Sequence, residues 1–178
     1  MDPIHSEIQF KVKHLMITTV TGSFKEYQLS AQTDDDDFTS GRVTFTADIN
    51  SISTNNPDRD AHLKSADFFD SANYKEIKFV STRIEKIDDT DYKLSGDLTI
   101  RGVTKNIKLD VEFGGIVKDP WGNTKAGFTV TGKISRKEYG VKWDAITEAG
   151  GVVVGDEVKI ACEVQLVQQQ VAAAEAKS

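Results

Sequence analysis

Residues 92–113 read YKLSGDLTIRGVTKNIKLDVEF, and they show the strand pattern of this chain most clearly. Apolar or small residues occupy every second position from Tyr92 to Ile100, and again from Ile107 to Phe113. Such alternation is typical of β-strands with one buried face. The Arg-Gly pair at 101–102 interrupts the pattern for only two residues. The stretch therefore predicts two antiparallel strands joined by a tight turn.

The same alternation recurs along most of the chain and predicts about eight strands. In the second strand it switches parity near Lys25 and Glu26, which indicates a β-bulge. Short connections favour antiparallel up-and-down order, and closure into a barrel would remove the exposed sheet edges. We expect an all-β fold, an eight-stranded antiparallel lipocalin-like barrel.

The connection from 51 to 74 alternates poorly and differs from the others. We expect a short helix in it, capped by Asp58. A chain of 178 residues is one domain by size. We place this barrel domain at 1–167, followed by a polar, Ala-rich tail at 168–178.

Composition excludes several classes of function. The balance of 22 basic and 28 acidic residues, without a basic stripe, argues against binding to nucleic acid. No apolar run approaches the roughly 20 residues of a transmembrane helix, so we expect no stable membrane insertion. No export signal is visible, so a cytoplasmic location is expected, or a periplasmic one if a leader was removed. The single Cys162 excludes an internal disulfide, and no metal-binding motif or cofactor is expected.

The residues predicted to point inward combine small and aromatic side chains: Ser6, Gly22, Ala47, Ser81, Gly96 and Gly132 with Phe10, Phe24, Phe45, Phe79, Phe113 and Phe128. One interpretation is a hollow apolar channel, which would suit an elongated hydrocarbon because each buried CH₂ contributes roughly 0.8 kcal/mol. The other interpretation is that the glycines only relieve strand bending at barrel corners. Composition does not decide between them.

Several longer motifs resemble those of YceI-like proteins. They are DPIHSEIQF (2–10), RDAHLKSADFFD (59–70), GDLTIRGVT (96–104), ISRKEYG (134–140) with Trp143, and VGDEV (154–158). The resemblance runs from about residue 2 to 167. It implies a lipocalin-like barrel that binds or carries a polyisoprenoid, of quinone or prenyl type, or a similar long-chain amphiphile. The resemblance leaves a homodimer open.

We expect the ligand to contact residues along the barrel interior and in the 51–74 connection. These candidates are Ile8, Phe10, His14, Phe24, Phe45, Arg59, His62, Phe68, Phe69, Phe79, Leu98, Phe113, Phe128, Val130, Ile134 and Trp143.

The polar candidates have alternative interpretations. Arg59 and His62 would contact a polar head group, or Arg59 and Asp60 would only hydrogen-bond the loop backbone. His14 is expected to be a hydrogen-bonded interior histidine more readily than a ligand contact. If Arg59, Asp60 and His62 converged, they would support an enzyme for a small hydrophobic substrate, which is the alternative function. A protein-interaction module of a stress response is a further alternative.

Overall fold

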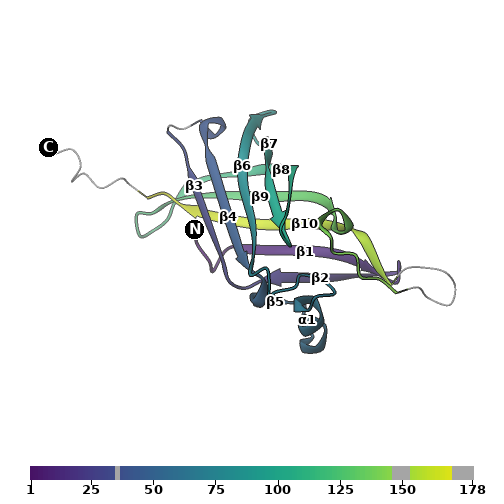
Figure 1. Ribbon diagram of the computed structural model, residues 1–178. Helices are drawn as coiled ribbons and strands as arrows, with labels where there is room; N and C mark the ends of the chain where they lie inside the picture. Colours follow the sequence, from purple (N-terminus) through teal and green to yellow (C-terminus); the bar gives the residue numbers. More distant parts are fainter. Residues whose placement is uncertain (35–36, 146–152, 170–178) are drawn as a thin grey trace.

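One antiparallel sheet of ten strands forms the wall of the molecule in a computed structural model, which describes residues 1–34, 37–145 and 153–169. Neighbouring strands follow the order β3-β4-β6-β7-β8-β9-β10-β1-β2-β5 (Figure 1). The strands are β1 (Glu7–His14), β2 (Thr18–Phe24), β3 (Tyr27–Gln32), β4 (Arg42–Asp48), β5 (Ile52–Ser53), β6 (Glu76–Lys86), β7 (Asp91–Ile100), β8 (Val103–Lys118), β9 (Thr124–Ser135) and β10 (Val154–Val167). The helices are α1 (Pro57–Lys64) and the 3₁₀ turns η1 (Phe38–Ser40), η2 (Ile49–Ser51) and η3 (Arg136–Tyr139).

The strand count is ten rather than the expected eight because two long strands bend sharply. β2 continues into β3 after the break at Lys25 and Glu26, and β4 continues into β5 through η2. The backbone N–H of Lys25 donates to Ser51 (3.1 Å), and that of Asp48 donates to Glu26 (2.9 Å). β2 pairs with β5, and β3 pairs with β4. The two bent strands therefore pair on both sides of a shared corner, and the sheet runs round into a curled barrel.

The parity switch in the sequence marks this corner. The side chains of Phe24 and Tyr27 both lie on the inner side although an odd number of positions, three, takes the chain from one to the other. The two intervening residues, Lys25 and Glu26, form the bend. The sequence therefore places the irregularity at the right residues, and the structure shows it to be a corner of the barrel.

The two ends of the barrel differ. At one end, which we call the open end, lie the β3–β4, β6–β7 and β8–β9 connections and residues 168–169. β3 has one partner strand, β4, among the described residues, and Figure 1 shows these two strands diverging from β1 and β10 toward this end. At the other end, the helix end, lie the β1–β2 turn, α1 and η3. There Ile49, Ile52, Tyr139 and Val141 are buried.

The hairpin predicted from residues 92–113 forms as expected. β7 and β8 pair from Asp91↔Glu112 to Ile100↔Val103, with Leu94 opposite Leu109 on the inner face. The turn residues Arg101 and Gly102 both have positive φ, 50° and 73°. This backbone is that of a two-residue hairpin turn whose twist matches the strands.

The short helix in the 51–74 connection also forms, but its cap differs from the predicted one. Asn56, not Asp58, is the N-cap, and its side chain accepts a hydrogen bond from the N–H of Arg59 (3.1 Å). Pro57 then occupies the first helical position, where its fixed φ is favourable and its missing N–H costs nothing. The helix therefore begins before Asp58.

Candidate functional site: an apolar cavity inside the barrel

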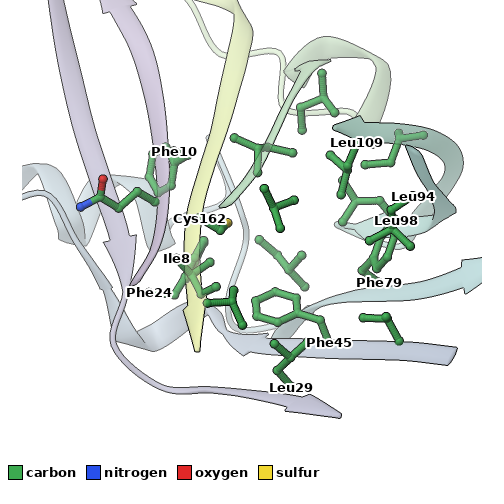
Figure 2. Close-up of a pocket in the computed structure, with 18 of the residues that line it drawn as sticks. Ile8, Phe10, Phe24, Leu29, Phe45, Phe79, Leu94, Leu98, Leu109 and Cys162 are labelled. Atoms are coloured by element: carbon green, nitrogen blue, oxygen red, sulfur yellow. The ribbon is translucent and has the colours of Figure 1, made fainter. Parts of the chain in front are cut away.

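The barrel encloses a cavity of about 1490 Å³. Its wall is formed by inward side chains of the strands and is mostly aliphatic and aromatic. Figure 2 shows Ile8, Phe24 and Cys162 on one side of the view and Leu94 and Leu98 on the other, with further apolar side chains of the cavity wall between them. The interior is thus hollow. Of the two interpretations of the inward small residues, the hollow apolar channel is the one that describes this protein.

Glycines on the wall explain how large aromatic rings fit without filling the interior. Phe10 on β1 pairs with Gly22 on β2, and its ring occupies the space that a Cβ on Gly22 would take. The ring of Phe79 lies in the same way over Gly96, and Leu109 lies over Gly132. The missing side chains let these groups lie flat against the wall. This arrangement, rather than strand bending alone, accounts for the inward glycines.

The structure brings the predicted ligand contacts together at one place. Every one of them except Phe113 lines the cavity. The ring of Phe113 instead packs against Phe38 (5.2 Å between ring centroids) and Phe128 (5.4 Å). Phe38 comes from η1 in the β3–β4 connection and itself lines the cavity. Phe38 is not among the contacts predicted from the sequence because an irregular loop has no alternation that assigns a face.

His14 is not the interior histidine that the alternation predicts. It is exposed at the end of β1, on the rim of the cavity at the helix end. The register of β1 on β10 shifts between Val12 and His14, so the alternation in the strand does not extend to this residue.

The polar candidates on α1 are engaged by hydrogen bonds in the loop. Arg59 donates from Nε to Thr54 Oγ1 (2.7 Å) and from Nη2 to the Thr54 carbonyl (2.7 Å). Asp60 accepts from the N–H of Thr54 (2.8 Å) and from its hydroxyl (2.6 Å). Both residues therefore fix the β5–α1 connection, as the second interpretation of them expects.

His62 does not hydrogen-bond to Thr54, unlike Arg59 and Asp60. Its Nε2 lies 2.9 Å from Asp67 Oδ2, and its ring packs edge-on against Phe68 (5.0 Å) and Trp143 (4.9 Å). Phe68 and Trp143 also contact each other (5.2 Å). Because Asp60 is bonded to Thr54 and His62 to Asp67, the acid–base group on which the enzyme alternative depends is not formed.

Arg136 is buried, and its guanidinium lies 3.8 Å from the Asp144 carboxylate and forms four hydrogen bonds with the backbone. It donates to the carbonyls of Gly155 (2.8 Å), Val141 (2.8 Å), Trp143 (2.8 Å) and Val154 (3.1 Å). These bonds tie η3, the segment after it and β10 together at the helix end. The guanidinium is thus held in place by these bonds, and Arg136 forms part of the cavity wall at the helix end.

Cys162 lies in the wall on β10 and is buried. Burial raises the pKa of this thiol to about 11. The thiol therefore stays protonated near neutral pH and adds a small, uncharged surface to the cavity. The described residues contain no group of three or more His, Cys, Asp or Glu side chains that could hold a metal ion.

The sequence matches the YceI-like domain over residues 1–166. The chain belongs to the YceI-like family. A UPF0312 protein of Staphylococcus epidermidis is 42% identical over 159 residues, which cover 89% of this chain and 90% of that protein. A UPF0312 protein of Staphylococcus aureus is 40% identical over the same share of both chains.

Solved structures of YceI-like and related proteins have the same fold. The YceI protein of Campylobacter jejuni, 35% identical, superposes with a TM-score of 0.77 over 96% of this chain and 97% of its own. BcnA of Burkholderia cenocepacia gives a TM-score of 0.81 at 22% identity, covering 93% of this chain and 98% of that one. A polyisoprenoid-binding domain from Saccharophagus degradans gives 0.63 at 16% identity, covering 92% and 94%. This YceI-like chain is therefore a barrel with a hydrophobic ligand-binding cavity. In the part of the chain that is described, no helix is long and apolar enough to cross a bilayer.

Proposed function

We propose that the protein binds a long-chain, neutral amphiphile, a polyisoprenoid of quinone or prenyl type, and carries or stores it inside the barrel. The observation that carries this proposal is the 1490 Å³ apolar cavity. Pockets for ordinary small molecules measure about 300–1,000 Å³. A larger, continuous and mostly apolar space favours a ligand with a long hydrocarbon portion.

The energetics of burial agree with such a ligand. Each CH₂ group moved from water into the cavity contributes roughly 0.8 kcal/mol, so about ten carbons contribute on the order of 8 kcal/mol before the costs of immobilisation. An ionised group deep in the cavity would need a free cation, because an unpaired buried charge is very unfavourable. The buried Arg136 is bonded to four carbonyls. In the deep part of the cavity a neutral group therefore fits better than a carboxylate or a phosphate, whereas Lys13 and Arg42 line the cavity near its ends.

The family and one structural neighbour support the same ligand class. The Saccharophagus degradans neighbour is a polyisoprenoid-binding domain with this fold. In the present chain the apolar contacts would be the wall residues predicted from the sequence, with Arg59 and His62 at the helix end. At the open end the wall includes Gln32 and Gln168, whose side-chain amides can hydrogen-bond a neutral head group. Binding, rather than catalysis, is the function that these residues support.

The proposal is tested by extracting purified protein with organic solvent and identifying bound lipid by mass spectrometry. Uptake of a fluorescent prenyl analogue by delipidated protein gives a second measurement. Val130 lines the cavity, whereas its neighbour Thr131 is exposed on the outside of β9. We expect Val130→Trp to reduce uptake about tenfold by filling the cavity, and Thr131→Trp to leave it unchanged.

Circular dichroism and thermal unfolding establish that both tryptophan variants are folded. Absence of extracted lipid together with absence of uptake would overturn the proposal. Equal uptake by the two variants would show that the analogue binds outside the barrel.

A further inference from the structure

The edge of the sheet along β3 borders the cavity directly. Six consecutive residues, 29–34, line the cavity there. On β7, which has a partner strand on each side, only alternate residues such as Leu94 and Leu98 line it. Ala31 lies on the same inner face as Leu29 and is nevertheless exposed. The cavity therefore opens sideways past β3, and not only at the open end of the barrel.

We call this lateral opening the seam. One border is β3, and the other is formed by residues 1–6, which lie against β10. The N–H of Asp2 donates to the carbonyl of Gln165 (2.8 Å), and the N–H of Gln165 donates to Ser6 Oγ (3.0 Å). At the base of the seam the hydroxyl of Tyr27 donates to the carbonyl of Ser6 (3.1 Å). Beyond this bond the described residues make no hydrogen bond across the seam, and Figure 1 shows β3 diverging from β10.

The hydrogen bonds of β4 show which backbone groups of β3 face the seam. The N–H of Val43 donates to Ser81 Oγ on β6 (2.8 Å), so the backbone groups of Val43 point toward β6 and away from β3. Ala31 is the register partner of Val43. Opposite residues in an antiparallel pair either exchange both hydrogen bonds or exchange none. The N–H and C=O of Ala31 therefore point away from β4 and into the seam.

The other end of β3 gives the same orientation. The N–H of Asp48 donates to the carbonyl of Glu26 (2.9 Å), so the carbonyl of Glu26 points toward β4. Counted in twos from Glu26, residues 28, 30 and 32 bond to β4, whereas Leu29 and Ala31 do not. Among the residues that the structure describes, nothing bonds to the backbone groups that these two residues direct outward. Free donors and acceptors thus lie beside an apolar cavity.

The seam favours an uncharged group. Free strand edges are commonly protected by charged side chains, lysine above all, but residues 27–33 include no charged residue. On the opposite border the carboxylate of Asp2 is already paired with Lys125 (3.1 Å) and His5 (3.0 Å). Arg42 lies opposite Gln32 at the outer limit of the seam and is exposed. A hydroxyl or carbonyl can bond to the free backbone groups without placing a charge beside the apolar wall.

We propose that the seam is the head-group site of the ligand. A hydroxyl or carbonyl of the amphiphile hydrogen-bonds the free N–H and C=O groups of Leu29 and Ala31, and its hydrocarbon chain occupies the cavity. This inference rests on the proposed function and identifies the part of the barrel that recognises the ligand. Main-chain groups recognise hydrogen-bonding capacity rather than one particular ring or alcohol. The ligand is favoured over a second copy of the chain at this edge because the edge and the cavity form one continuous space.

The test removes one free donor by Ala31→Pro. Proline is tolerated on an edge strand where its nitrogen faces away from the partner strand, so the pairing with β4 is kept. The delipidated full chain is titrated with geranylgeraniol and with the matching hydrocarbon that lacks the hydroxyl, each in competition with the fluorescent prenyl analogue. We expect Ala31→Pro to weaken geranylgeraniol binding about five- to tenfold, as expected for the loss of one hydrogen bond. Binding of the hydrocarbon should be unchanged.

Ala31→Val is the matched control, because valine adds a similar volume and keeps the N–H. It should bind both lipids as the wild type does. Gln32→Pro tests the orientation of the strand, since the N–H of Gln32 bonds to β4. Gln32→Pro should lower the urea midpoint, whereas Ala31→Pro should leave it nearly unchanged. Equal destabilisation by the two prolines would show that the N–H of Ala31 is not free, and would overturn the proposal.

Hydrogen exchange gives a measurement without any substitution. The amide of Ala31 should exchange rapidly in the ligand-free protein and more slowly with geranylgeraniol bound, but not with the hydrocarbon bound. Slow exchange in the ligand-free protein that increases with protein concentration would make a second copy the occupant of this edge. That result would overturn the head-group site.

Further outcomes separate this inference from the proposed function. If Ala31→Pro weakens both lipids equally, or if Ala31→Val has the same effect, the substitution acts on the cavity wall and the head-group site is wrong. Tighter binding of geranylgeranyl phosphate than of geranylgeraniol would contradict a neutral head group. If both lipids bind and Ala31→Pro changes neither, the proposed function stands and only the head-group site fails. Absence of binding of either lipid by the wild type contradicts the proposed function itself.

Discussion

The ring of Phe10 lies over Gly22, its direct partner on the neighbouring strand. A Cβ at position 22 would overlap three atoms of this ring, and the ring has no room to retreat outward through the sheet. The pair therefore sets the position of the wall. It keeps an aromatic side chain out of the middle of the cavity.

Replacing Gly22 with alanine should push the ring of Phe10 inward. We expect Gly22→Ala to lower the free energy of unfolding by about 1–3 kcal/mol, because overpacking forces side chains out of their preferred rotamers. The prenyl analogue should bind more weakly as the ring enters the lumen. Urea unfolding and analogue titration measure the two effects. The control is Gly127→Ala, since a Cβ at Gly127 meets nothing within 4 Å. Equal effects of the two substitutions would contradict this account.

A substitution at Tyr139, unlike Gly22→Ala, should increase the free energy of unfolding. Tyr139 is 1% exposed, and its hydroxyl has no hydrogen-bond partner among the described residues. A buried hydroxyl without a partner loses its bonds to water and gains nothing in return. We expect Tyr139→Phe to raise the free energy of unfolding by about 1 kcal/mol in urea titration. A loss of stability of similar size would show that the hydroxyl has a partner in solution.

Strands are the part of this fold that the sequence predicts best. A period of two shows directly in residues such as Leu94, Leu98 and Leu109, because one face of each strand is buried and the other is wet. The corner at Lys25 and Glu26 is also visible, since it changes the parity of the pattern. Alternation cannot show that the two halves of a bent strand pair separately. It therefore predicts eight strands where the structure has ten.

The candidate site is predicted less completely because part of it depends on contacts distant in sequence. Wall residues follow from alternation, but Phe38 reaches the wall from a loop. His14 leaves the wall because the register shifts beside it. The roles of Arg59 and His62 depend on hydrogen bonds to Thr54 and Asp67, which no periodicity reveals. Composition does not give the volume of the barrel interior, so only the structure shows that the interior is hollow.

The stability of the protein should decrease at alkaline pH because Cys162 is buried. Burial raises its pKa from 9.0 to about 11. A group whose folded-state pKa is raised contributes stability that is fully present below the unfolded pKa and is lost as the pH rises through the folded one. Wild-type stability should therefore fall between about pH 9 and pH 11. Cys162→Ala lacks this contribution, so its stability should fall less over that range. Urea titrations at several pH values measure the free energy of unfolding of both proteins. The same pH dependence in the wild type and in Cys162→Ala would count against the burial of the thiol.

Arg136 should be the residue at the helix end that is most sensitive to substitution. Four backbone carbonyls accept hydrogen bonds from its guanidinium. Methionine at this position has a similar length but leaves those buried acceptors without donors. We expect Arg136→Met to lower the free energy of unfolding by roughly 3 kcal/mol or more.

The neighbouring Lys137 provides the control for Arg136. It is 45% exposed and lies 3.7 Å from Asp144, which is a surface ion pair. Lys137→Met should therefore change stability by less than about 1 kcal/mol. Arg136→Lys separates charge from geometry, because one ammonium keeps the charge but cannot reach all of the carbonyls that surround the edge of the planar guanidinium. If Arg136→Lys were as stable as the wild type, charge alone would hold this end of the barrel, and the carbonyl contacts would not be the cause.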